Sequence, residues 1–273
     1  MSAPNTLFDR KALLRNRARS SDHGLFLHDA AADEIEERLK FINRSFTSPA
    51  TVSGFPSSWE RFGPLVPDND VLALKDSSCD LIVHGLSMHW SEDPVGQLIQ
   101  CRRALKPDGL FLGALFGGET LNQLRSCLGE AEISVTGGLS PRIIPFGDIR
   151  DLGGLLQRAG FALPVADSQK ITVEYRSALH LMRDLRAMGE TNALTDRLKR
   201  FTARNVLLEA SRLYAENYSG ASENIEATFE IIFLTGWAPD ESQPKPLKPG
   251  SATARLSEAL GVPEVILERD RDE

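Results

Sequence analysis

The clearest pattern of apolar and polar positions lies in residues 79–118, where it predicts a strand, a helix and a second strand. The apolar run DLIV at 80–83 is typical of a strand buried on both faces of a parallel sheet. Residues 94–105 repeat their apolar positions at helical spacing. The sequence KPDG at 106–109 predicts a tight turn in which glycine supplies a positive φ, and an apolar strand follows at 110–116. We therefore expect a right-handed βαβ unit.

The segments around this unit predict further elements of an α/β protein. Acidic and apolar positions at 29–41 predict a helix with Asp29 as its N-cap, and Asp148 is expected to cap another helix. The β-branched and aromatic run at 227–237 predicts a final strand. We expect this strand to pair antiparallel with the one that ends near Tyr175.

The second half of the chain predicts an insertion and a tail. Amphipathic patterns at 177–188 and 203–218 predict two helices, interpreted as a cap between the last two strands. A Pro-rich run at 238–250 predicts a linker, and a short helix is expected at 252–260. The expected organisation is an N-terminal helical segment at 1–44, an α/β domain at 45–175 plus 226–238, a helical cap at 176–225, and a linker and tail at 239–273.

Composition narrows the class of protein. The chain has 273 residues, of which 41% are hydrophobic and 25% charged, values that are ordinary for a globular protein with a substantial core. Its formal net charge of −7 argues against a general nucleic-acid binder. Cys79, Cys101 and Cys127 are far apart and are interpreted as core residues in a reducing compartment. No metal-ligand motif and no apolar run of membrane-spanning length is present, so we expect a cytoplasmic protein without an integral membrane segment.

The stretch at 7–19 is rich in positive charge. Its basic side chains are Arg10, Lys11, Arg15, Arg17 and Arg19. The preferred interpretation is the solvated face of a helix. The alternative is a lid whose cations meet an acidic partner or a carboxylate. The composition also suits a mitochondrial presequence, although the nearby Asp9 argues against this.

The segment CDLIVHGLSMHW, the helix after it and the sequence LKPDG followed by a strand resemble the fourth and fifth strands of class I S-adenosylmethionine-dependent methyltransferases. The resemblance implies a Rossmann-like sheet with an antiparallel last strand and a helical cap. It also implies S-adenosylmethionine as the cofactor. In this family a glycine-rich loop after the first strand brings the backbone close to the methionine part of the cofactor.

That loop is degenerate in this chain. After the expected first strand at 51–53, only Gly54 remains, and Phe55 and Pro56 follow it. Pro56 lacks a backbone donor. Only one short helix and one short strand fit before Asp68, where the family has a longer βαβ unit. We therefore expect a sheet shortened at its first βαβ unit and a reduced cofactor site.

Further segments narrow the resemblance to one branch of the family. These are FGGETL, GGLSPRIIPF, DLGGLLQRAGF, DLRAMGETN and ATFEIIFLTGW. They are similar to the mitochondrial complex I assembly factor that hydroxylates an arginine of a complex I subunit, and to the malonyl-carrier methyltransferase of the biotin pathway. The resemblance implies a methyltransferase-like protein that acts on a protein or carrier substrate. The alternative is a non-catalytic assembly factor for a respiratory complex, or an arginine hydroxylase, so activity itself is left open.

Candidate site residues fall into two groups. On the cofactor side, the resemblance implies that Asp68 accepts a hydrogen bond from the adenine amino group, with the Asn69 amide on a ring nitrogen and Gly54 allowing close approach. His84, at the end of the strand, is the candidate general base because the ordinary pKa of histidine lies near neutral pH. A structural role for His84 is at least as compatible with the sequence, and a turn rich in Asp and Asn before a strand is an equally good interpretation of residues 68–70.

On the substrate side, the candidates are Trp90, Glu119, Arg142 and Asp148. Trp90 is expected in the core or the pocket wall. Glu119 and Asp148 can hold a guanidinium group, and Arg142 can hold a carboxylate. Each of these charged residues is also compatible with a helix cap or a surface position.

Overall fold

The computed structural model describes residues 6–220, 224–244 and 261. The chain divides into two units, Met1–Asp240 and Glu241–Glu273. The helices and strands that are described all belong to the first unit. The helix expected at 252–260 and most of the expected tail at 239–273 lie outside the described residues.

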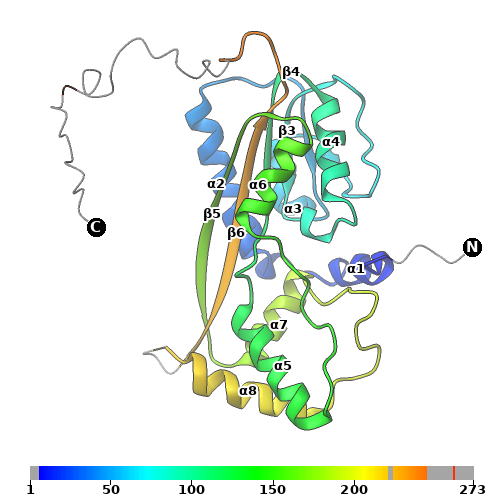
Figure 1. The fold of residues 1–273 in the computed structure, drawn as a ribbon, viewed down its shortest axis with the longest axis vertical. Coiled ribbons are helices and arrows are strands. Elements are labelled where there is room, and N and C mark those ends of the chain that lie inside the picture. Colours follow the sequence, from blue (N-terminus) through cyan, green and yellow to red (C-terminus); the bar gives the residue numbers. More distant parts are fainter. Residues whose placement is uncertain (1–5, 221–223, 245–260, 262–273) are drawn as a thin grey trace, which may run out of the picture. The chain divides into compact units, whose positions relative to one another are not determined.

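The strands of the first unit form one mixed sheet (Figure 1). They are β1 Pro49–Val52, β2 Leu65–Val66, β3 Cys79–Gly85, β4 Leu105–Phe116, β5 Ala162–Tyr175 and β6 Ile225–Trp237. Their order is β2-β1-β3-β4-β6-β5. Neighbouring strands from β2 to β4 run parallel, and β6 runs antiparallel to both β4 and β5. The expected Rossmann-like sheet with an antiparallel last strand is confirmed.

Helices cover both faces of this sheet. They are α1 Arg10–Arg17, α2 Phe26–Ile42, α3 Pro56–Trp59, α4 Pro94–Ala104, α5 Asn122–Thr136, α6 Ile149–Arg158, α7 Ala178–Met188 and α8 Arg204–Tyr218. In β3, Leu81 and Val83 pack with α2 and α3, whereas Ile82 packs with α4 and α6. This alternation follows from the two-residue period of a strand buried on both faces.

The β5–β6 pair carries a group of helices past the end of β4. Phe116, the last residue of β4, pairs with Ile231, but the β5–β6 ladder continues as far as Tyr175 and Ile225. The helices α5, α7 and α8 pack beside this extension (Figure 1). They therefore lie beyond the carboxyl ends of the parallel strands, the edge where open α/β sheets bind ligands.

The first βαβ unit is short, as expected. Between β1 and β2 the structure has only α3 and a 3-10 turn at Glu60–Phe62. Trp59 of α3 is fully buried and fills the space beside Gly85, where an added Cβ would come within 2.2 Å of the indole ring. The indole therefore packs directly against the end of β3.

Two local predictions are wrong. Residues 106–109 do not form a turn before the strand, because β4 already begins at Leu105 and the β3–β4 register shifts there. The positive φ of 57° belongs to Asp108 and not to Gly109. Asp29 is not an N-cap either, since α2 begins at Phe26 and its first turn contains Asp29.

Candidate functional site

Two cavities lie along the carboxyl edge of the sheet. The first, here called the polar cavity, has a volume of about 470 Å³ and lies where β1 and β2 end. Its lining comes from α1, from the loop after β1 and from the loop after β2, and includes Arg10, Leu14, Arg17, Gly54, Phe55, Ser57, Pro67, Asp68 and Asn69. It contains the cofactor-side candidates Gly54, Asp68 and Asn69.

Asp68 binds two arginines of α1. One of its oxygens lies 2.8 Å from Nη2 of Arg10, and both oxygens lie 2.8 Å from Nη1 of Arg17. Burial alone would raise the pKa of this carboxyl, but Arg17 and Arg10 outweigh burial and hold the pKa below its ordinary value. The preferred interpretation of 7–19 as a solvated face is therefore wrong for Arg17, whose side chain is 5% exposed, whereas that of Arg10 is 34% exposed. Both cations meet a carboxylate, which is the contact that the alternative interpretation expected.

Arg17 also covers Gly54. A Cβ added at Gly54 would lie 2.2 Å from Nη1 of Arg17, so the guanidinium lies directly against this glycine. Its carbon is 5.1 Å from the centre of the Phe55 ring. Nε and Nη2 of Arg17 are buried and have no hydrogen-bond partner among the described residues. Two buried donors are thus available to a ligand beside the loop after β1.

Asn69 contradicts its expected role. Its backbone N–H donates to the Pro67 carbonyl at 2.8 Å. Its own carbonyl accepts from Nε2 of Gln97 at 3.0 Å. The amide is therefore used within the protein and does not offer a donor to an adenine ring.

His84 is buried on the α4 face of the sheet. Its Nε2 lies 3.2 Å from Oε1 of Gln97, and the side chain lines neither cavity. Burial is the main cause that lowers the pKa of His84 to about 4. This geometry indicates a structural histidine and speaks against a general base.

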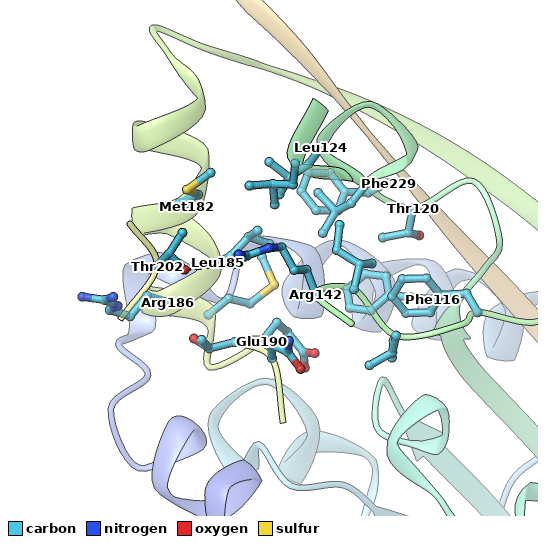
Figure 2. A pocket seen from close by; sticks show the side chains of 18 of the residues that line it. Phe116, Thr120, Leu124, Arg142, Met182, Leu185, Arg186, Glu190, Thr202 and Phe229 are labelled. Atoms are coloured by element: carbon cyan, nitrogen blue, oxygen red, sulfur yellow. Dashed lines mark hydrogen bonds between the residues drawn. The ribbon is translucent and has the colours of Figure 1, made fainter. Parts of the chain in front are cut away.

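The second cavity, here called the apolar pocket, also has a volume of about 470 Å³ and lies beyond the end of β4. Figure 2 shows its side chains converging from α5, α7 and the connecting loops, with Leu124 and Phe229 on one side in this view and Glu190 on the other. Apolar residues of its wall include Trp90, Phe116, Leu121, Leu124, Phe146, Met182, Leu185 and Phe229. Trp90 is thus placed in a pocket wall, one of its two expected positions.

Glu190 is the buried charge of this pocket. Its side chain is only 7% exposed, and Oε2 accepts from Nε1 of Trp90 at 2.7 Å and lies 3.4 Å from Nε2 of His89. Burial alone would raise the pKa of Glu190, but the interactions with His89 and the charge of Arg17 hold it below its ordinary value. Its Oε1 has no partner among the described residues.

Arg142 lines the apolar pocket but is already paired. Its Nη2 and Nε lie 2.6 Å and 2.9 Å from the Glu132 carboxylate, and Nη1 donates to Oγ1 of Thr202 at 3.0 Å. The hydrogen bonds from Arg142 are the main cause that lowers the pKa of Glu132 to about 2. Arg142 therefore forms part of the wall of the apolar pocket. To bind a substrate carboxylate, it would have to give up its contact with Glu132.

Asp148 and Glu119 lie outside both cavities. Asp148 caps α6 by accepting from the backbone N–H of Arg150 at 2.8 Å and of Asp151 at 2.9 Å. Glu119 is half-exposed and accepts from Nδ2 of Asn122 at 3.1 Å. The structure thus gives both acids the helix-end and surface positions that the sequence also allowed, and does not bring them to a substrate.

Sequence reasoning missed three residues of this region: Arg17, His28 and Glu190. Arg17 was grouped with solvated arginines, and His28 lies just before the helix expected at 29–41, although α2 begins at Phe26. Glu190 lies in the segment DLRAMGETN, directly after Gly189 and the end of α7. An acid directly after the glycine that ends a helix was the available signal.

The chain is similar to known methyltransferases and hydroxylases. Residues 60–113 match the methyltransferase domain family. The chain is 43% identical over 206 residues to "Arginine-hydroxylase NDUFAF5, mitochondrial" of Dictyostelium discoideum, covering 75% of this chain and 47% of that protein. It is 40% identical over 227 residues to the Homo sapiens protein of the same name, covering 83% of this chain and 62% of that protein. A malonyl-[acyl-carrier protein] O-methyltransferase of Xylella fastidiosa (strain M23) is 34% identical over 181 residues, covering 66% of this chain and 59% of that protein.

These comparisons also show how much of each relative the chain matches and in which compartment the relatives are found. The matches span 47% to 62% of the length of the two hydroxylases. The expectation of a cytoplasmic protein is contradicted, because both hydroxylases are named as mitochondrial. Among the described residues, no helix has both the length and the apolar character that a membrane crossing needs.

The order of the sheet, the matching methyltransferase domain and the relatives agree with one another. The chain belongs to the class I S-adenosylmethionine-dependent methyltransferase-fold family, in the branch of the arginine hydroxylase and the malonyl-carrier methyltransferases, and its glycine-rich loop is degenerate.

Proposed function

We propose that this protein is an S-adenosylmethionine-dependent methyltransferase that acts on a protein or a carrier-bound substrate. The observation that carries the proposal is the pair of cavities along one sheet edge, a polar one after β1 and β2 and an apolar one after β4. In open α/β sheets this edge binds the ligand. The polar cavity is assigned to the cofactor and the apolar pocket to the methyl acceptor.

The residues of the polar cavity fit the cofactor. Its volume of about 470 Å³ falls within the range of roughly 300–1,000 Å³ that is usual for ligand sites. Asp68 follows β2, the strand beside β1, where an acid typically binds ribose hydroxyls in nucleotide-binding sheets. We therefore assign Asp68 to the ribose and not to the adenine amino group. The free donors of Arg17 suit a carboxylate.

When bound, S-adenosylmethionine supplies an electrophilic methyl group. The contribution of the chain is to orient the acceptor and to exclude water, which methyl transfer chiefly requires. The aromatic and aliphatic wall of the apolar pocket suits both roles. The exposed side chains of Arg186 and Arg200 add positive charge to its lining, which favours an acidic partner.

The substrate class follows from this pocket and from the relatives. An apolar pocket suits the aliphatic part of a protein side chain or of an acyl chain on a carrier. The relatives carry the names arginine hydroxylase and malonyl-[acyl-carrier protein] O-methyltransferase. We propose a respiratory-complex subunit or an acyl carrier as the partner.

The test is transfer of a labelled methyl group. Purified protein is incubated with methyl-labelled S-adenosylmethionine and with each partner class, and the products are analysed by intact mass. A gain of one methyl group per acceptor supports the proposal. No transfer to either class, with binding of the cofactor intact, contradicts it. A gain of one oxygen atom instead would assign the chemistry named for the hydroxylase relatives.

A further inference from the structure

Three residues around Phe55 have buried polar atoms without a partner in the described part of the chain: Nε and Nη2 of Arg17, Nε2 of His28 and Oε1 of Glu190. Arg17 lines the polar cavity and Glu190 lines the apolar pocket, whereas His28 lines neither cavity and packs against Phe55. The side chains of Arg17 and Glu190 are 5% and 7% exposed, and His28 is fully buried. Buried polar atoms are nearly always hydrogen-bonded, so this group requires a partner.

The three residues come from distant segments that meet at Phe55. Asn16, the neighbour of Arg17, donates to the carbonyl of Thr191, the neighbour of Glu190, at 2.9 Å. A Cβ added at Gly189 would lie 3.1 Å from the Cα of Arg17 and 3.3 Å from the Phe55 ring. The ring centroid of His28 lies 4.1 Å from that of Phe55. Phe55 directly follows Gly54, where the family has its glycine-rich loop.

The hydrogen-bonding roles of the three groups are fixed by their other contacts. Nδ1 of His28 accepts from Nε1 of Trp59 at 3.1 Å, so in the neutral ring the proton is on Nε2. Burial lowers the pKa of His28 to about 3, which keeps the ring neutral. Arg17 and His28 therefore present donors, and Glu190 presents an anionic acceptor.

A ligand that satisfies all three groups carries both charges. A simple anion would satisfy the donors but would lie beside the carboxylate of Glu190, and a simple cation would lie beside the guanidinium of Arg17. Arg17 is paired with Asp68, and Glu190 accepts from Trp90 and lies beside His89, but Arg17 and Glu190 do not form an ion pair with each other. The α-carboxylate and α-ammonium of an amino acid match this arrangement.

Two positions of the loop offer no backbone donor for this role. The N–H of Phe55 donates to Oγ of Ser53 at 3.1 Å, and Pro56 has no N–H. The guanidinium of Arg17 lies against Gly54. We propose that Arg17, His28 and Glu190 form a side-chain cradle for the amino-acid end of S-adenosylmethionine, in place of the glycine-rich loop. The proposal rests on the cofactor assignment made above.

The test compares two ligands by calorimetric titration of the full chain. S-adenosylhomocysteine carries the amino-acid end, and 5′-methylthioadenosine has the same adenosine and thioether without it. We expect S-adenosylhomocysteine to bind at least about tenfold more tightly, because its carboxylate and ammonium add charge-assisted hydrogen bonds that 5′-methylthioadenosine cannot make. Equal affinity would overturn the cradle and leave the cofactor assignment standing. No binding of either ligand would overturn the cofactor assignment itself.

Variants then show which side chains cause the tighter binding of S-adenosylhomocysteine. We expect Glu190→Gln to weaken S-adenosylhomocysteine about tenfold and to leave 5′-methylthioadenosine within about twofold. Arg17→Gln also removes the contact with Asp68, so we expect it to weaken both ligands, and S-adenosylhomocysteine about tenfold more than 5′-methylthioadenosine. Arg10→Gln is the matched control, because Arg10 also binds Asp68 but is not part of the cradle. It should change both affinities by the same factor. If folded Glu190→Gln still prefers S-adenosylhomocysteine by the same factor, the proposal is overturned. If that variant does not fold, comparing the two ligands on the unmodified chain still tests the proposal.

Discussion

Nη1 of Arg17 lies 2.8 Å from both carboxylate oxygens of Asp68, although 51 positions separate the two residues in sequence. This contact fixes α1 over the ends of β1 and β2. Because Arg17 also covers Gly54, one side chain connects the degenerate loop, the acid after β2 and the helix above them. The side chains of Arg17 and Asp68 therefore occupy the site where the glycine-rich loop is degenerate.

Breaking this contact should destabilise the fold. Asp68→Asn leaves the buried Arg17 without its counter-charge, and losing one partner of a buried pair typically costs about 3–5 kcal/mol. We expect a loss near the lower value, because Arg17 keeps its contact with Phe55. Denaturant unfolding measures it. Asp76→Asn, which breaks the exposed pair with Arg103, should change stability by less than about 1 kcal/mol, and similar losses in both variants would contradict the account.

A methyl group at Gly54 should have a comparable local effect. Its Cβ would meet Nη1 of Arg17 at 2.2 Å, and overpacking of this kind typically costs about 1–3 kcal/mol. Gly54→Ala should therefore unfold at lower denaturant concentration. Gly154→Ala is the control, since a Cβ there meets nothing within 4 Å in the interior of α6. That variant should gain up to about 1 kcal/mol, and a loss at Gly154 equal to that at Gly54 would refute the explanation.

Stability should fall with acid below the ordinary pKa of histidine. The folded-state pKa values of His28 and His84 are lowered by burial to about 3 and about 4. The unfolded chain therefore binds more protons below about pH 6.5, and each histidine makes the free energy of unfolding fall by up to about 1.4 kcal/mol per pH unit until its folded pKa is reached. His84→Gln should flatten the profile measured between pH 7 and 5. His23→Gln, at an exposed position, should leave the slope unchanged, and an equal slope in all three proteins would be inconsistent with this origin.

Filling the apolar pocket should separate acceptor binding from cofactor binding. Leu124 is buried in the pocket wall, so Leu124→Trp reduces the space for an acceptor. We expect methyl transfer to fall more than about tenfold, while the affinity for S-adenosylhomocysteine stays within about twofold. Leu208→Trp, at an exposed position of α8, should alter neither. Loss of both properties in folded Leu124→Trp would mean that the two cavities were assigned wrongly.

The sheet could be predicted because its signals are local. The apolar runs of β3, β4 and β6 and the small number of residues between β1 and β2 are visible in the sequence without knowledge of contacts. The start of α2 was predicted wrongly, and the positive φ predicted for Gly109 belongs to Asp108. The exact ends of helices and strands depend on tertiary contacts, which propensity alone does not decide.

The site could be predicted only in part, because its charges are paired over long distances. Asp68 was found through the family resemblance, but its partners lie on α1. Arg17 looks like a surface residue in a basic helix, and only the fold shows that its side chain is 5% exposed. Glu190 reaches Trp90 across 100 positions. Periodicity does not report such contacts, whereas the cap at Asp148 is local.

The central claim is that the polar cavity beside the shortened first βαβ unit still binds the cofactor. Calorimetric titration of S-adenosylmethionine into the purified chain tests it most directly, with Asp68→Ala as the first variant. The account predicts binding at roughly 100 μM or tighter, about −5.5 kcal/mol, and a clear weakening in the variant. No heat from S-adenosylmethionine with folded protein, confirmed by an unshifted thermal unfolding midpoint, would contradict the claim.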